Sequence, residues 1–441
     1  MNTLDGWIAD RIGLSGPLTR TALAAWQTDR LREAVAYARA ASPFYRARCD
    51  WPDAEFSSPE DVARLPFTTA ADLLRNDPPL LALSQGDVAR VVTLPSSGTS
   101  GPPKRLHFSP EDREATIDFF AHGMGLFTRR GDRVAVAFPG GAAGGIVDGL
   151  SAALGRLGAD CRRAISPFDP EALAAWLRTE QPDVVVGPPV PLLAAGRWAS
   201  CDGGAPLRAR AVLLSSDHVV QSLARAIGAA FGAEVFTHWG MTETGYGGAV
   251  DCACHCGCHL RENELLVEIV DAATGAPAPP GEIGEIVVTT LRRRAVPLVR
   301  YRTGDLARLA EARCRCGSIL KRLDGFAARL DGAVPLPGGG ALTLPRLDEA
   351  VFAVDGVSDF MATYQPDPAV LSLSIAAPPA LRVPAMLDAV RARLADDPVV
   401  GVALRQGLFR IEASFADAVL FRREGKRTLV KRESASCARC C

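Results

Sequence analysis

Short apolar segments alternate with helix-like segments through the middle of the chain, and this alternation restricts the fold more than any other feature. Strand-like runs lie at Arg133–Phe138, Asp183–Val186 and Ala211–Leu214, and a helix is expected at 146–157. Strands that alternate with helices form βαβ units, in which parallel strands share one sheet and helices cover its faces. The sequence therefore predicts an α/β fold.

The pattern differs on either side of this region. Apolar residues recur at helical spacing over 18–40, which predicts an α-helical N-terminal segment. Two β-like runs, Leu265–Val270 and Glu285–Thr290, flank a Gly/Pro-rich turn and predict an antiparallel β subdomain. We therefore expect a large N-terminal domain over 1–323, with mixed and parallel sheets, helices and this β subdomain.

A small, mobile C-terminal α/β domain is expected over 324–441. Its expected elements are helices near 347–354 and 383–395 and strands at Val399–Leu404 and Leu408–Ala413.

Bulk composition excludes several classes of protein. The 441 residues are 48% hydrophobic and 22% charged, with a formal net charge of -1, which is typical of a soluble globular protein of two or three domains. Basic residues are spread thinly, so no nucleic-acid surface is expected. No apolar run is long enough to span a membrane, and the N-terminus lacks the apolar region of a signal peptide. A cytoplasmic location is therefore expected.

One polar segment has the composition of a phosphate-binding loop. It follows a β-like run, and its candidate contacts are Ser96, Ser97, Gly98, Thr99, Ser100, Gly101 and Lys104. Glycines allow backbone N–H groups to turn toward an anion, hydroxyls add donors and the lysine adds positive charge. The same composition also suits a flexible linker, so this segment alone leaves both interpretations open.

Most of the twelve cysteines fall into clusters. Residues 251–259 hold four Cys and two His, and Cys314 and Cys316 lie downstream. Soft ligands from two short loops are typical of a structural, four-coordinate zinc site. The remaining group, Cys437, Cys440 and Cys441, is expected to form an exposed, oxidisable tail.

Four segments, in this order, resemble motifs of the adenylate-forming (ANL) superfamily. They are the phosphate loop Ser96–Lys104, the adenylate motif His238–Thr244, the ribose motif Tyr301–Leu306 and the catalytic-lysine motif Arg422–Arg427. The resemblance is to the phenylacetate–coenzyme A ligase-like branch and covers nearly the whole chain.

This resemblance implies an ATP-dependent ligase. A carboxylate would attack ATP to give acyl-AMP and pyrophosphate, and the thiol of CoA would then displace AMP. Small residues after Phe138 leave volume for an aryl, arylacetic or other bulky acid. The alternatives are an adenylating enzyme with a carrier-protein or amine acceptor, and an inactive nucleotide-binding zinc protein. A homodimer is implied by the resemblance alone.

The resemblance also implies roles for individual residues. Lys426 would bridge the carboxylate and the α-phosphate, Thr242 would hydrogen-bond that phosphate, and Glu243 would hold Mg²⁺. Asp305 would accept both ribose hydroxyls. Trp239 can stack on adenine, and Gly240 allows close backbone approach. The other expected nucleotide contacts are His238, Met241, Arg322, and Ser215, Ser216 and Asp217 at the end of a strand.

Some members of this branch carry a zinc site whose pattern maps onto Cys252, His259, Cys314 and Cys316. His255 is the alternative ligand, because the first loop offers more candidates than the pattern needs. The metal would link the adenylate-motif loop to the β subdomain and would take no part in the chemistry.

Overall fold

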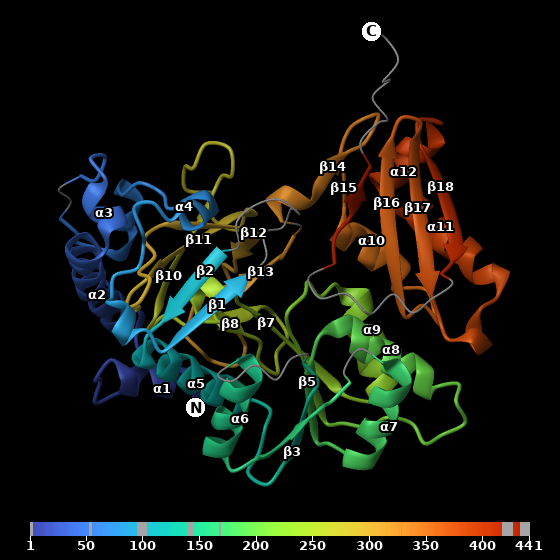
Figure 1. The fold of residues 1–441 in the computed structure, drawn as a ribbon, viewed down its shortest axis with the longest axis horizontal. Helices are drawn as coiled ribbons and strands as arrows, with labels where there is room; N and C mark the ends of the chain where they lie inside the picture. Colours follow the sequence, from blue (N-terminus) through green and yellow to red (C-terminus); the bar gives the residue numbers. More distant parts are fainter. Residues whose placement is uncertain are drawn as a thin grey trace. The chain divides into compact units, whose positions relative to one another are not determined.

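A computed structural model describes residues 3–52, 55–94, 104–138, 145–166, 169–327, 329–416 and 427–432. The chain forms two compact units (Figure 1). The first contains residues 1–129, 142–158 and 238–327, and the second contains residues 130–141, 159–237 and 328–441. The α/β fold expected from the sequence is confirmed. The domain boundary expected at 323 stays a prediction.

Helices of the first unit begin where the sequence supplies capping side chains. Thr19 accepts a hydrogen bond from the Ala22 N–H at the start of α2, and Ser109 and Asp112 form a reciprocal capping box at the start of α5. Helices α5 and α6 pack side by side (Figure 1). The helices are α1 (Thr3–Arg11), α2 (Arg20–Ala41), α3 (Pro43–Ala47), α4 (Ala70–Arg75), α5 (Pro110–Met124) and α6 (Ile146–Leu157).

Strands of the first unit form a hairpin and a mostly antiparallel sheet. The predicted antiparallel pairing of Leu265–Val270 with Glu285–Thr290 is confirmed, with Leu265 opposite Thr290. The hairpin is β1 (Arg90–Leu94) with β2 (Lys104–Phe108). The sheet has the order β10 (Leu265–Val270), β11 (Gly284–Thr290), β12 (Tyr301–Leu309), β13 (Arg322–Asp324), β9 (Cys258–Leu260) and β8 (Ala249–Val250), with β8 next to the end of β7.

The second unit contains the expected parallel sheet. Its central strands β5 and β6 are short, apolar and buried, and helices connect its neighbouring parallel strands, as βαβ units require. The order is β4 (Asp160–Arg163), β3 (Arg133–Val136), β5 (Val184–Gly187), β6 (Ala211–Leu214) and β7 (Glu234–Trp239), whose last two residues belong to the first unit. The helices are α7 (Pro170–Glu180), α8 (Pro189–Ala199) and α9 (Gln221–Phe231).

A second group of elements in this unit comes from the C-terminal third of the chain. Helix α10 contacts α9, where the Ser222 N–H donates to Glu349 at 2.9 Å. A four-stranded sheet has the order β18 (Arg410–Phe415), β17 (Ala369–Ala376), β16 (Asp359–Pro366) and β19 (Val430–Lys431). The other elements are β14 (Ala333–Pro335), β15 (Ala341–Thr343), α10 (Leu344–Val351), α11 (Pro384–Asp396) and α12 (Val400–Arg405).

One strand prediction is wrong. The sequence pattern favours a strand at Val399–Leu404, but the structure forms helix α12 there. The Asp397 carboxylate accepts hydrogen bonds from the N–H groups of Val399 and Val400, both at 2.9 Å. This aspartate satisfies N–H donors that would otherwise be unpaired at the start of a helix. Burial of the Val400 side chain in the helical conformation further stabilises α12. The next expected strand is confirmed as β18, shifted by two residues.

A buried ion-pair cluster joins the last described segment to α10 and β16 within the second unit. Arg427 lies 2.6 Å from Asp348 and 3.3 Å from Asp359. Its guanidinium also lies over the rings of Phe352 and Phe360, at 5.1 and 4.5 Å from their centroids. Burial raises the pKa of Asp348 to about 7, although Arg427 opposes this shift.

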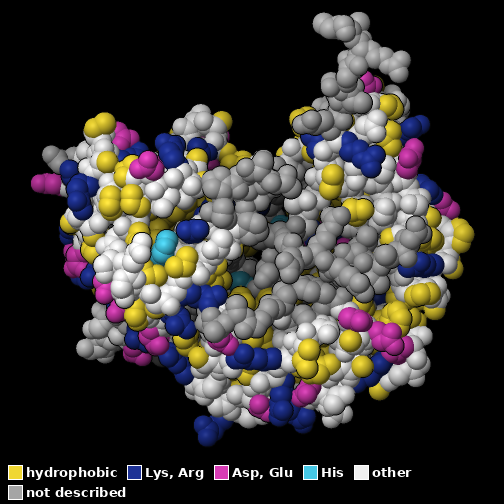
Figure 2. All heavy atoms as spheres, in the orientation of Figure 1, with side chains coloured by type: hydrophobic (Ala, Val, Ile, Leu, Met, Phe, Trp, Pro, Cys, Tyr) yellow, Lys and Arg dark blue, Asp and Glu magenta, His cyan; other side chains and the backbone are white. Residues whose placement is uncertain are grey.

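Basic and acidic side chains are interspersed over the described residues visible in Figure 2. The expected lack of a nucleic-acid surface stays a prediction. Among the helices of the described residues, none combines the length and the hydrophobicity that crossing a bilayer requires.

The Arg427 cluster predicts that replacing a buried aspartate destabilises the protein far more than replacing an exposed one. Asp348→Ala leaves a buried guanidinium with fewer partners and should lower the free energy of unfolding by about 3–5 kcal/mol. Asp388 is exposed and pairs at 2.8 Å with Arg391, whose side chain is 42% exposed, so Asp388→Ala should leave the unfolding midpoint close to that of wild type. Urea unfolding followed by circular dichroism measures both. Equal midpoints for the two variants would contradict this account of the cluster.

Candidate functional site

The phosphate-loop lysine and the acid of the adenylate motif form a buried ion pair in the first unit. Lys104 is the first residue of β2, and Glu243 lies in a short helical turn, Thr242–Thr244, after β7. The Lys104 Nζ lies 2.5 Å from Glu243 Oε1, and both side chains are largely buried. The Tyr301 hydroxyl lies 3.4 Å from each of these two atoms. The fold therefore brings three of the predicted motifs to one place.

The backbone of the adenylate motif is held in a tight turn. The Met241 carbonyl accepts hydrogen bonds from the N–H groups of Thr244 and Tyr246, at 3.1 and 2.8 Å. A Cβ at Gly240 would lie 1.8 Å from the Tyr246 carbonyl oxygen, so only glycine fits there. Glycine at this position is thus required by the turn itself. Burial lowers the pKa of His238 to about 4, which keeps its imidazole neutral near pH 7.

Trp239 contacts the predicted ribose-binding residue. Its indole Nε1 donates to Asp305 Oδ2 at 3.1 Å. The side chain is 6% exposed and packs in an apolar cluster with Leu260 and Leu265. In this structure Trp239 therefore orients the Asp305 carboxylate from the core, and its stacking on adenine stays a prediction.

The four cysteine and histidine residues implied by the branch lie together. The ligand atoms of Cys252, His259, Cys314 and Cys316 all lie within 4.8 Å of one another. The Sγ atoms of Cys252 and Cys314 are 3.6 Å apart, and the Cys316 Sγ lies 3.4 Å from His259 Nε2. Four ligands at about 2.3 Å from a tetrahedral zinc would be separated by roughly 3.8 Å, so these distances suit that metal.

The electrostatics of this cluster also fit a metal. Burial lowers the pKa of His259 to about 4, so its imidazole is neutral, as metal binding requires. Burial opposes ionisation of Cys314, but hydrogen bonds from the Cys316 N–H and from neighbouring thiols lower its pKa to about 7. The buried His259 Nδ1 has no hydrogen-bond partner among the described residues. These donors form a closed soft-ligand set, which is typical of structural zinc.

The other candidate ligands of the first loop lie differently. His255, the alternative ligand, is not part of the group of four, and its Nδ1 lies 2.7 Å from Asp251 Oδ2. Cys256 Sγ lies 3.4 Å from Cys314 Sγ, which places one further thiol beside the cluster. The structure therefore offers Cys256, and not His255, as the competing ligand.

Arg322 connects the two cysteine loops. Its guanidinium donates to the backbone carbonyls of Cys256 in the first loop and Ala312 just before the second. The side chain is buried, with 5% exposed. These contacts occupy the guanidinium, and the nucleotide contact expected for Arg322 stays a prediction.

The remaining predicted residues lie in the second unit or outside the described residues. Ser215–Asp217 follow β6 at the carboxyl end of the parallel sheet, which is where such sheets bind ligands. Ser216 has a φ of 73°, a strained conformation for a residue other than glycine. Ser96–Gly101, Lys426 and the cysteines at 437, 440 and 441 lie outside the described residues.

Sequence reasoning missed the roles of Tyr301 and Arg427. Tyr301 opens the ribose motif, but a tyrosine at the start of a β-like run gives no sign that its hydroxyl will reach Glu243. Arg427 follows the expected catalytic lysine and looks like part of a basic tail. Its ion-pair partners Asp348 and Asp359 lie 79 and 68 residues earlier in the chain, so no local sequence pattern reveals these contacts.

Metal analysis can test the cluster directly. We expect about one zinc ion per purified chain. Cys314→Ser made together with Cys256→Ser should lose most of it and lower the thermal midpoint, because Cys256 can then no longer replace the missing ligand and three ligands cannot complete a tetrahedral site. Cys201→Ser is the control, since the Cys201 thiol donates to carbonyls of helix α8 and is not part of the group of four, so this variant should keep full zinc occupancy. Cys256→Ser should also keep the metal. Full occupancy in the Cys314→Ser/Cys256→Ser double variant would exclude this ligand set.

Comparisons with known proteins identify the family. The family model described as AMP-binding enzyme matches residues 32–291, more than half of the chain. A phenylacetate-coenzyme A ligase of Pseudomonas putida is 29% identical over 348 residues, which are 77% of this chain and 77% of that protein. The phenylacetate-coenzyme A ligase of Escherichia coli strain K12 is 30% identical over 339 residues, with 72% of this chain and 73% of that protein covered.

Solved structures agree on the fold. The crystal structure of 2-hydroxyisobutyryl-CoA ligase in the postadenylation state, in complex with 2-HIB-AMP, matches with a TM-score of 0.76 and 22% identity, over 93% of this chain and 90% of that one. At this identity the likeness shows the fold alone. Together with the motif geometry, the family match and the 30% identical relative show that the chain belongs to the AMP-binding enzyme family, in its phenylacetate-coenzyme A ligase branch.

Proposed function

We propose that the protein is an AMP-forming carboxylate–CoA ligase. The carboxylate of an acid attacks the α-phosphate of ATP and releases pyrophosphate, which leaves an acyl-adenylate. The thiolate of CoA then attacks the acyl carbon, AMP leaves and a thioester forms. Membership of the family supports this reaction, and the observation that carries it is the ion pair between Lys104 and Glu243.

This pair is suited to an anionic reaction centre. Lys104 supplies positive charge from the phosphate loop, and Glu243 supplies a hard oxygen ligand for the Mg²⁺ that accompanies ATP. Because both groups are held in a largely buried position before substrate binds, little reorganisation is needed when charge develops on the α-phosphate. Mg²⁺, when bound, would neutralise phosphate charge. Thr242, next to Glu243 in the same turn, is the proposed hydroxyl donor to that phosphate.

Asp305 is the proposed acceptor for the ribose hydroxyls. A carboxylate whose position is fixed by Trp239 Nε1 can accept both hydroxyls without losing side-chain freedom on binding. On the second unit, Ser215–Asp217 are proposed to contact the base. Zinc would be held by Cys252, His259, Cys314 and Cys316, and its role is to fix two loops of the first unit.

Lys426 is the proposed catalytic lysine of the first half-reaction. Its ammonium group would bridge the attacking carboxylate and the α-phosphate. The neighbouring Arg427 is anchored by Asp348 and Asp359, so the residue after the lysine has a fixed place in the second unit. The small C-terminal domain, proposed over 324–441, would rotate between the two half-reactions.

The acid is proposed to be an aryl or arylacetic carboxylate. This proposal rests on the names of the curated relatives, which are phenylacetate-coenzyme A ligases at 29–30% identity. The small residues expected to line the acyl site, 139–144, lie outside the described residues. A homodimer and a cytoplasmic location stay predictions from the sequence.

Pyrophosphate release tests the reaction and identifies the acid. Purified protein with ATP and Mg²⁺ is offered aryl, arylacetic, fatty and amino acids, with and without CoA. We expect release with aryl or arylacetic acids that turns over only when CoA is present, because the adenylate otherwise stays bound. Pyrophosphate release at the same rate with and without CoA would indicate that the acceptor is a carrier protein or an amine. No release with any acid, despite tight ATP binding, would favour an inactive nucleotide-binding protein.

If Lys426 is the catalytic lysine of the first half-reaction, its replacement should slow that half-reaction and leave the second almost unchanged. Lys426→Ala should slow acyl-adenylate formation by about 10²–10³-fold, the cost of removing one charge-stabilising donor. Thioester formation from synthetic acyl-adenylate and CoA should fall by less than about threefold. Lys431→Ala, in β19 of the same unit, removes the same charge from an exposed position and should affect neither step. An equal loss of both steps in Lys426→Ala would refute the assignment.

A further inference from the structure

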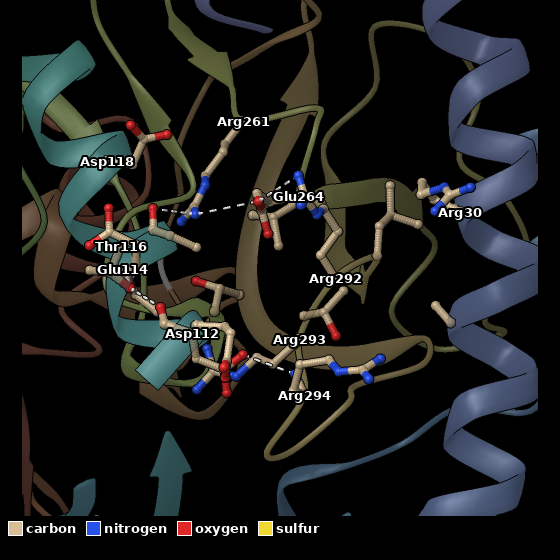
Figure 3. Close-up of a pocket in the computed structure, with 18 of the residues that line it drawn as sticks. Arg30, Asp112, Glu114, Thr116, Asp118, Arg261, Glu264, Arg292, Arg293 and Arg294 are labelled. Carbon is tan, nitrogen blue, oxygen red and sulfur yellow. Dashed lines mark hydrogen bonds and ion pairs between the residues drawn. The ribbon is translucent and has the colours of Figure 1, made fainter. Parts of the chain in front are cut away.

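A cavity of about 780 Å³ in the first unit is lined by charged side chains that offset one another (Figure 3). Arg261 and Arg292 lie 4.0 and 3.9 Å from Glu264, and Asp112 accepts a hydrogen bond from the Arg294 N–H. Among the described residues, six arginines and six acids line this cavity, so it has no excess charge that would select an ion. The unused chemistry of the first unit lies instead in its cysteine loops.

One thiol lies beside the proposed zinc ligands without belonging to them. Cys256 is in the first cysteine loop and is not part of the group of four. Its Sγ is 3.4 Å from the Cys314 Sγ, which is closer than the 3.6 Å between Cys252 and Cys314. A ligand thiol and a thiol outside the ligand set are therefore in direct contact.

Two backbone constraints fix the position of Cys256. Arg322, which is buried, donates a hydrogen bond to the Cys256 carbonyl. The next residue, Gly257, has a φ of 109°, and a Cβ there would lie 2.7 Å from the Leu323 carbonyl oxygen. Because only glycine fits this turn, the loop holds Cys256 against Cys314 rather than leaving it free to move away. The contact between the two sulfurs is thus built into the fold.

Exposure distinguishes Cys256 from the ligand cysteines that it adjoins. Cys252 and Cys314 are 4% and 5% exposed, whereas Cys256 is partly exposed. A thiolate bound to a metal shares its electron pair with that metal, and burial also shields it from solutes. Cysteines that respond to oxidants are accessible and lie next to a second cysteine that can react with the first oxidation product. Cys256 and Cys314 have this arrangement.

We propose that hydrogen peroxide joins Cys256 and Cys314 in a disulfide and so removes one ligand of the zinc site. The Cys256 sulfur attacks a peroxide oxygen, the O–O bond breaks, and a sulfenic acid and water form. The Cys314 sulfur then attacks the Cys256 sulfur, the S–O bond breaks, and the hydroxide takes up a proton and leaves as a second water. The two cysteines lose two electrons, which the peroxide accepts.

The disulfide is incompatible with the zinc site. The thiolate is the form of cysteine that binds a metal, and a disulfide sulfur carries no such charge. Cys252, His259 and Cys316 would remain, and three ligands do not complete a closed tetrahedral site. Oxidation therefore releases the metal, and reduction by a dithiol restores both thiols and the site.

Loss of the metal would weaken the support of the ATP site, a consequence that rests on the proposed function. Strand β9, which carries His259, pairs with β13 and with β8, and β8 pairs with His238 and Trp239 at the end of β7. Trp239 in turn donates to Asp305, the proposed ribose acceptor. The oxidised protein should therefore bind ATP more weakly than the reduced protein.

Zinc release and peptide mapping on purified, zinc-loaded protein test the proposal. Burial raises the pKa of the Cys256 thiol, so little of it is thiolate near neutral pH and peroxide is added in large excess. A zinc-binding dye follows release, and mass spectrometry of the alkylated digest locates the disulfide. Wild type should release its zinc as a Cys256–Cys314 bridge forms, and dithiothreitol should remove the bridge. Cys256→Ser, which keeps all four ligands, should release zinc at least about fivefold more slowly.

Cys254→Ser is the matched control, because Cys254 lies in the same loop, is also partly exposed and is not part of the group of four. It should release zinc at the wild-type rate. Equal rates in Cys256→Ser and wild type, or a bridge that joins Cys252 to Cys314 in wild type, would overturn the proposal. Because the mapping depends only on the two thiols, it decides the proposal even for protein that shows no ligase activity or carries no zinc.

Discussion

The ion pair between Lys104 and Glu243 holds together the parts of the first unit on which the candidate site depends. It joins the β1–β2 hairpin, the turn after β7 and the start of β12, because Tyr301 contacts both charges. Removing two charges from water costs several kcal/mol each, and this cost is offset only when geometry and added hydrogen bonds are good. An acid and a lysine kept in such a position are more easily explained by a phosphate-binding reaction than by stability.

A second constraint acts on the loops behind this site. Arg322 donates to the carbonyls of both cysteine loops, and Gly257 adopts a φ of 109° where a side chain would collide with the Leu323 carbonyl. The proposed zinc ligands come from the same two loops. The Gly257 backbone, the Arg322 hydrogen bonds and the proposed zinc site therefore all stabilise the same arrangement. They fix β9 and β13 beside each other in the sheet that carries Asp305.

The sequence by itself determined the fold class, most element positions and the order of the motifs, because these depend on short-range periodicity, capping and turn chemistry. The capping box at Ser109 and the helix at 146–157 are examples. It misassigned Val399–Leu404, where hydrogen bonds from the first N–H groups to the Asp397 carboxylate, together with burial, outweigh β propensity. Only the tertiary structure decided which of the clustered cysteines meet, that Trp239 supports Asp305, and that Arg293 is buried beside Phe108. Those outcomes depend on contacts between residues far apart in the chain, whose burial and geometry no local pattern encodes.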